Sequence, residues 1–100
     1  MSPWALIGLG VSDLGAGDPR GAVVWLWRGI EACHRSGLVM VETVGYDHLA
    51  RAHEQWGNSS EAERLHGVAL ALAQSSGSGK AEGRQRQRLG SLLTRLGRWF

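Results

Sequence analysis

The chain has 100 residues, of which 43% are hydrophobic, a formal net charge of +2 and one cysteine. This length allows one small domain with a modest core, and the sequence lacks the run of about eighteen apolar residues that could cross a membrane. The single Cys33 excludes an internal disulfide and is typical of a reducing compartment, so we expect a cytoplasmic protein. The apolar N-terminal stretch has no basic residues ahead of it, and we interpret it as part of the fold.

An internal repeat organises the chain. A shift of forty residues places 14–37 on 54–77, with Gly17 on Gly57 and Ala22 on Ala62. A second shift of forty brings Leu89 into register. We therefore expect an all-α domain of about five helices, formed by antiparallel hairpins. Its expected units are repeat one at 3–37, repeat two at 42–77 and a half repeat at 81–100, within a single domain over 1–100.

The first unit contains a helix that should end at Gly17, a residue able to adopt the left-handed conformation past a helix end. The chain restarts at Asp18 and Pro19, which suit the N-cap and the first helical position. Ala22, near the start of the second helix, is small enough for the paired helices to approach closely. Cys33 is expected to be a small buried apolar residue.

The second unit repeats this pattern. A helix over 42–56 should end at Gly57, and Asn58 or Ser60 should cap the next helix, because Ser60 and Glu63 have capping-box spacing. The segment Ser75-Ser76-Gly77-Ser78-Gly79-Lys80 then separates the second unit from the third.

Gly77 to Lys80 has part of the pattern of a phosphate-binding loop. Such a loop requires a glycine five residues before Gly79 and a hydroxyl residue after Lys80, but Gln74 and Ala81 occupy these positions. The preceding segment is patterned as a helix and not as a strand. We therefore interpret this segment as a linker and expect no nucleotide cofactor.

The C-terminal end carries the basic charge. Residues 1–79 contain five arginines and eight acidic residues, whereas 80–100 contain six basic residues and one acidic residue. The tail forms an amphipathic pattern with the apolar stripe Leu89, Leu92, Leu93, Leu96, Trp99 and Phe100. Packing on the second unit is the first interpretation, and binding to phosphates or an anionic membrane surface is the alternative. Because the sequence given contains no companion for this helix, we also expect self-association through the stripe. A natural polypeptide that continues, or a tail that frays, is the alternative.

The repeat resembles the tetratricopeptide repeat. The matching residues are Leu9-Gly10, Gly17-Asp18, Ala22 and Gly29-Ile30, then Tyr46, Leu49-Ala50, Gly57-Asn58, Glu61-Ala62, Leu65 and Ala69-Leu70, and finally Leu89-Gly90, Leu93 and Gly97. The period of forty differs from the commonest thirty-four, and is similar to a longer-helix variant found in bacterial signal-responsive regulators and animal polarity and motor scaffolds. Asp13 and His53 replace the usual aromatic residue late in the first helix, and the proline that often closes a unit is missing.

The resemblance implies a right-handed superhelix that binds a partner peptide or helix in a concave groove lined by the first helix of each unit. Carried over by register, the groove residues are Trp4, Ile7, Val11, Asp47, Arg51, Glu54, Arg84, Gln87, Ser91 and Arg95. One wall is apolar and the far wall basic, so an acidic partner with an apolar anchor is expected. Packing of Trp4 and Ile7 on a neighbouring segment is an equal alternative.

The histidines and Cys33 do not form a metal-binding pattern. His48 and His53 are five residues apart and diverge around a helix, and the sequence has no zinc-type pair of cysteines or histidines. Asp47, His48 and Ser91 form no recognisable catalytic triad. We expect no enzyme activity, no metal and no cofactor.

Overall fold

The computed structural model describes residues 1–76 and 87–89. The first range contains the helices α1 (Pro3–Gly15), α2 (Pro19–Ser36), α3 (Val39–Trp56) and α4 (Ser59–Ser76). Residues 87–89 are also helical, and no strand occurs within either described range. The predicted all-α fold is confirmed. Most of the expected half repeat, including its apolar stripe beyond Leu89, lies outside the described residues.

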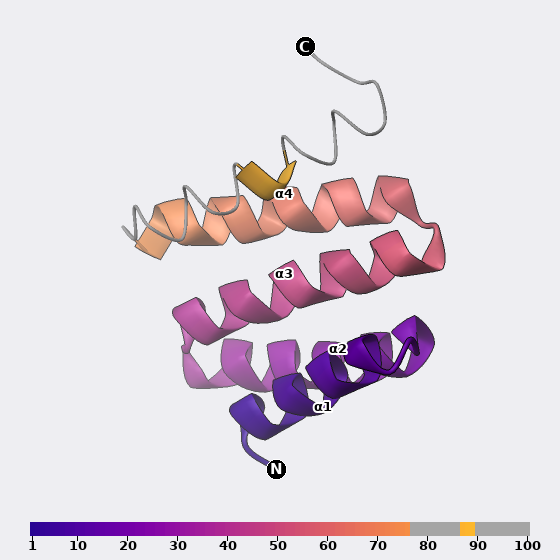
Figure 1. Ribbon diagram of the computed structural model, residues 1–100. Helices are drawn as coiled ribbons and strands as arrows, with labels where there is room; N and C mark the ends of the chain where they lie inside the picture. Colours follow the sequence, from indigo (N-terminus) through magenta and orange to yellow (C-terminus); the bar gives the residue numbers. More distant parts are fainter. Residues whose placement is uncertain (77–86, 90–100) are drawn as a thin grey trace.

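The helices form two antiparallel hairpins, α1 with α2 and α3 with α4, and these hairpins stack through contacts of α3 with α2 and α1 (Figure 1). Apolar side chains from all four helices are buried between them. The core includes Ile7, Ala22, Leu26, Ile30, Cys33, Leu49, Ala50, Ala62, Leu65 and Ala69. Cys33 is buried as expected, and burial together with the nearby Glu42 carboxylate raises its thiol pKa.

Three glycines turn the chain between the helices. Gly17, Gly37 and Gly57 have φ angles of 79°, 70° and 87°, in the left-handed region that glycine adopts without steric cost. The predicted left-handed conformation of Gly17 and Gly57 past a helix end is therefore confirmed. Gly57 caps α3 directly, whereas α1 ends at Gly15 with Ala16 as its cap, and Gly17 follows that cap. The Asp18 cap is also confirmed, since its Oδ1 accepts a hydrogen bond of 3.0 Å from the Gly21 backbone N–H.

Two predicted helix starts differ from the structure. Helix α3 begins at Val39 and not at residue 42, because Gly37 reverses the chain in one residue and the Glu42 N–H donates to the Leu38 carbonyl. Ser60 does not cap α4, because this helix already begins at Ser59. The first helical hydrogen bond runs from the Ala62 N–H to the carbonyl of Asn58, the residue before the helix. The valines at the start of α3 are poor helix formers, but burial of Val41 against the core compensates.

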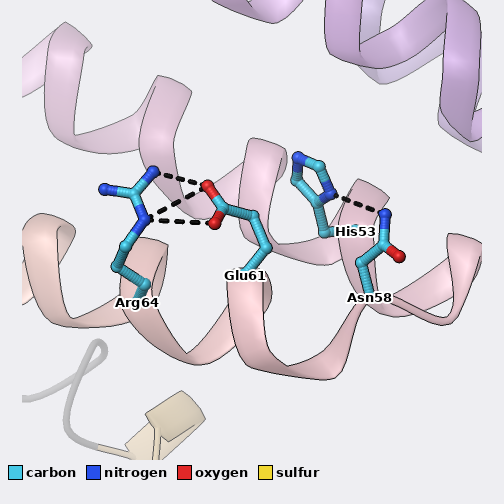
Figure 2. Close-up of polar contacts among 4 residues, drawn as sticks. All are labelled: His53, Asn58, Glu61 and Arg64. Carbon is cyan, nitrogen blue, oxygen red and sulfur yellow. Dashed lines mark hydrogen bonds and ion pairs between the residues drawn. The ribbon is translucent and has the colours of Figure 1, made fainter.

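A side-chain hydrogen bond joins the turn between α3 and α4 to a histidine on α3. The Asn58 side-chain amide donates to Nδ1 of His53 over 3.3 Å, and the Glu61–Arg64 ion pair lies beside it (Figure 2). Because Nδ1 accepts this bond, the imidazole must be neutral to make it. Burial lowers the pKa of His53, and Arg64 adds to this effect, whereas Glu61 opposes it.

Glycines also allow the helices to approach one another closely. A methyl group added at Gly10 would lie 2.5 Å from Leu26 Cγ, one at Gly29 would lie 2.7 Å from Ile7 Cγ1, and one at Gly45 would lie 2.7 Å from Ile30 Cγ1. These distances are far below van der Waals contact. The three glycines are therefore contact positions for the pairs α1–α2 and α2–α3.

We expect Gly10→Ala to destabilise the protein by about 1–3 kcal/mol, because the new methyl overpacks the contact with the buried Leu26. Gly8→Ala in the same helix is the matched control, since nothing lies within 4 Å of its added methyl. This control should be stabilised by up to about 1 kcal/mol through helix propensity. Urea unfolding measures both, and equal stabilities of the two variants would contradict the observed α1–α2 packing.

The His53 contact predicts a pH dependence. The unfolded chain binds a proton at histidine near pH 6.5, about the usual pKa, whereas folded His53 resists protonation. The unfolded state therefore binds more protons as pH falls below this value, and the free energy of unfolding should decrease. Urea unfolding at about pH 7 and about pH 5.5 should show the decrease, and His53→Gln should reduce it. A decrease of the same size in His53→Gln would contradict this assignment.

Candidate functional site

A hollow of about 230 Å³ opens between α1 and α3. Val11, Leu14 and Gly15 line it from α1, and His48, Arg51 and Gln55 line it from α3. We call these six residues the α1–α3 groove. Val11 and Arg51 are separated by the repeat period of forty, as are Gly15 and Gln55. Two of the three positions that each first helix contributes to the groove are thus equivalent in the repeat.

The two walls of the α1–α3 groove differ in polarity. Val11 is exposed and Leu14 is half-buried, and together they make the α1 wall apolar. Arg51 on α3 is exposed and makes no ion pair with another described residue. Burial lowers the pKa of His48, and Arg51 and Arg88 add to this effect against the opposing Asp47. The α3 wall therefore offers a permanent positive charge beside a neutral imidazole at neutral pH.

The ten predicted groove residues divide into four groups. Val11 and Arg51 come together in the α1–α3 groove. Trp4 is exposed on α1 two turns before Val11, on the same side of the helix, and Gln87 is exposed in the short helical stretch at 87–89. Arg84, Ser91 and Arg95 lie outside the described residues.

The remaining three predicted positions need correction. Ile7 is 3% exposed and belongs to the apolar core, and Asp47 is also 3% exposed. Glu54 is half-buried and accepts a hydrogen bond from His66 on α4. These side chains face neighbouring helices and not the groove. The side of α3 that was predicted to face the groove therefore differs by about one residue from the observed side. The observed side consists of His48, Arg51 and Gln55.

Asp47 and Glu54 belong to a buried polar cluster between α3 and α4. His66 is 1% exposed, and its Nε2 lies 2.9 Å from Oε1 of Glu54, to which it donates. Its Nδ1 lies 3.9 Å from Oδ1 of Asp47, and Nη1 of Arg88 donates to Oδ2 of the same carboxylate. Within the described residues, neither Asp47 Oδ1 nor His66 Nδ1 has a hydrogen-bond partner.

This polar cluster replaces an apolar one in the first unit. At the positions forty residues earlier, Ile7 corresponds to Asp47, Leu14 to Glu54 and Leu26 to His66. Ile7 and Leu26 are in the apolar core, and Leu14 packs against it. The two hairpins therefore use equivalent positions for packing, but with apolar side chains in the first unit and polar side chains in the second.

Sequence reasoning missed four groove residues, namely Leu14, Gly15, His48 and Gln55. The repeat itself contains the signal that could have found two of them, because Gly15 and Gln55 follow the predicted Val11 and Arg51 by four residues in both units. Residues four apart lie on the same face of a helix. His48 is three residues before Arg51 and shares that face for the same reason.

No group of three or more potential metal ligands is found in the part of the chain that the structure describes. Among the same residues, none of the helices has the length and apolar character required to cross a bilayer. Comparisons with protein-family models, curated proteins and solved structures find no match to this chain.

We expect Asp47→Ala to destabilise the fold by about 3 kcal/mol, because it leaves His66 and Arg88 without their buried carboxylate. Arg51→Ala, four residues further along the same helix, should change stability by less than about 0.5 kcal/mol. Urea unfolding measures the stability of both variants. A stability loss restricted to Arg51→Ala would contradict the finding that Asp47 is buried and Arg51 is exposed.

A triple variant tests the cluster as a unit. Asp47→Ile, Glu54→Leu and His66→Leu together introduce the side chains that the first unit has at the equivalent positions. Replacement of a buried charged group by well-packed apolar residues is often neutral or stabilising. This variant should be at least as stable as Asp47→Ala alone. A lower stability would show that the two units do not pack in equivalent ways.

Proposed function

We propose that the protein is a protein-interaction module of the tetratricopeptide-repeat type that binds a partner peptide or helix in the α1–α3 groove. The observation that carries the proposal is the hollow between the first helices of the two units, lined at equivalent repeat positions by Val11 and Arg51. The stacked hairpins also support it, because such stacks create extended concave binding surfaces.

The chemistry of the two walls indicates the kind of partner. An apolar side chain would be removed from water against Val11 and Leu14, at about 25 cal/mol for each Å² of apolar surface buried. A carboxylate beside that side chain would meet the Arg51 guanidinium, which binds carboxylates through two parallel hydrogen bonds. We therefore infer a segment with an apolar anchor next to an acidic residue.

The alternative of phosphate or membrane-surface binding uses the basic C-terminal segment, which the sequence predicts to be an amphipathic helix. Most of this segment lies outside the described residues. Arg88 is its one described arginine, and it contacts Asp47 within the protein. Salt distinguishes the two functions, since phosphate binding weakens steeply with added salt and binding of an apolar anchor weakens little.

The proposal predicts the outcome of a peptide selection. A displayed random-peptide library selected on the folded chain should become enriched in sequences that place an acidic residue beside a large apolar one. Binding of a selected peptide, measured by fluorescence anisotropy, should weaken at least about tenfold in Arg51→Glu, which corresponds to about 1.4 kcal/mol. Val11→Asp should have a similar effect because it places a charge in the apolar wall.

Two exposed residues of α2 outside the groove supply matched controls. Arg28→Glu repeats the charge reversal and Val24→Asp repeats the apolar-to-acidic change, and both residues are exposed. Neither variant should change the affinity by more than about twofold. A selected peptide that binds Arg51→Glu and Val11→Asp as well as the parent would overturn the proposed site.

A further inference from the structure

A second cleft, of about 320 Å³, opens between α2 and α3. Trp27, Ile30, Glu31, His34 and Arg35 line it from α2, and Glu42 and Tyr46 line it from α3. We call it the α2–α3 cleft. At 100° for each residue, Glu42 and Tyr46 lie on nearly the opposite side of α3 from the residues of the α1–α3 groove. This cleft is therefore a separate feature, and nothing in its chemistry depends on the proposed function.

The cleft combines aromatic walls with a buried carboxylate. The rings of Trp27 and Tyr46 meet edge to face, with centroids 5.9 Å apart and an interplanar angle of 88°. Glu42 beside them is 6% exposed, and the ion pair that it makes within the described residues joins it to His34 Nδ1 at 3.5 Å. His34 is highly exposed, so it shields this carboxylate weakly.

The negative charge of Glu42 acts on two neighbouring titratable groups. Burial raises the pKa of Tyr46, and Glu42 adds to this effect whereas Arg64 opposes it. Burial raises the pKa of Cys33 as well, and Glu42 again adds to the effect. The basic Arg35 does not balance Glu42, because its guanidinium is 3.9 Å from Glu31 at the exposed rim. The inner part of the cleft thus holds a carboxylate in a partly desolvated, aromatic surrounding.

We propose that the α2–α3 cleft binds a guanidinium group. A buried carboxylate is costly without a positive partner, and a guanidinium provides this charge with a planar fork that matches the two carboxylate oxygens. The same planar cation is attracted to aromatic faces such as those of Trp27 and Tyr46. The volume lies at the lower end of the range for small-ligand pockets, as expected for a site that accepts one side chain or one small cation.

The test compares two amino-acid derivatives that differ in charge. N-acetyl-arginine amide and N-acetyl-citrulline amide have nearly the same shape, but citrulline is neutral. In alkaline buffer, where histidine is neutral, titration of the isotope-labelled chain should give saturable NMR shifts of the Trp27 indole and the Glu42 region with the arginine compound. Citrulline should bind at least about tenfold more weakly, equivalent to about 1.4 kcal/mol. Equal binding of both compounds, or no saturable shift with either, would overturn the proposal.

Two glutamates of the cleft provide a matched pair of variants. Glu42→Gln keeps the shape of the inner carboxylate and removes its charge, and it should weaken arginine binding at least about tenfold. Glu31→Gln makes the same change at the exposed rim and should weaken binding by no more than about twofold. Circular dichroism checks that both variants remain folded. If Glu42→Gln does not fold, the arginine-to-citrulline comparison on the unmodified chain still decides the proposal.

A peptide arm identifies the source of the guanidinium. A short peptide with one central arginine is titrated beside the free arginine derivative. Tighter binding of the peptide would assign the cleft to an arginine of a partner protein, and equal affinities would assign it to a free guanidinium compound. Both results support the site, whereas a peptide that binds with equal affinity after its arginine is changed to citrulline would contradict it.

Discussion

The close approach of the helices at Gly10, Gly29 and Gly45 is the constraint on which the rest of the structure depends. At each of these positions an added methyl group would lie within 3 Å of a side chain on the neighbouring helix. The absence of a side chain lets Leu26, Ile7 and Ile30 enter the contacts between helices. This packing fixes the rotation of α1 and α3, and with it the residues that these helices turn toward solvent.

The orientation of α3 about its own axis gives this helix three different roles. Its side that includes Arg51 forms the α1–α3 groove, the side that includes Asp47 meets α4, and the side that includes Glu42 forms the α2–α3 cleft. A helix in the middle of a stack has neighbours on several sides, so a rotation by one residue would move side chains among all three surfaces. The groove and the cleft are therefore chemically distinct although they share a helix.

The sequence predicted the helical class, the repeat and the turns at Gly17 and Gly57 because these features depend on local conformation and periodicity. It predicted Val11 and Arg51 in the groove but misplaced Asp47 and Glu54, because charged side chains are expected at the surface. Their burial depends on His66, which is twelve residues beyond Glu54 and meets it only after α4 folds back. The α2–α3 cleft could not be predicted for the same reason, since the positions of Trp27 and Glu42 in space follow from the packing of two helices.

The change from Ile7, Leu14 and Leu26 to Asp47, Glu54 and His66 also affects how the chain selects its pairings during folding. A protein made of two similar hairpins could exchange helices, with α2 taking the place of α4 against the same side of α3, or two molecules could exchange hairpins. Such a pairing would place Leu26 where His66 belongs and leave the carboxylates of Asp47 and Glu54 buried without that partner. The polar cluster thus opposes mispairing between repeats, and the triple apolar replacement would remove this protection.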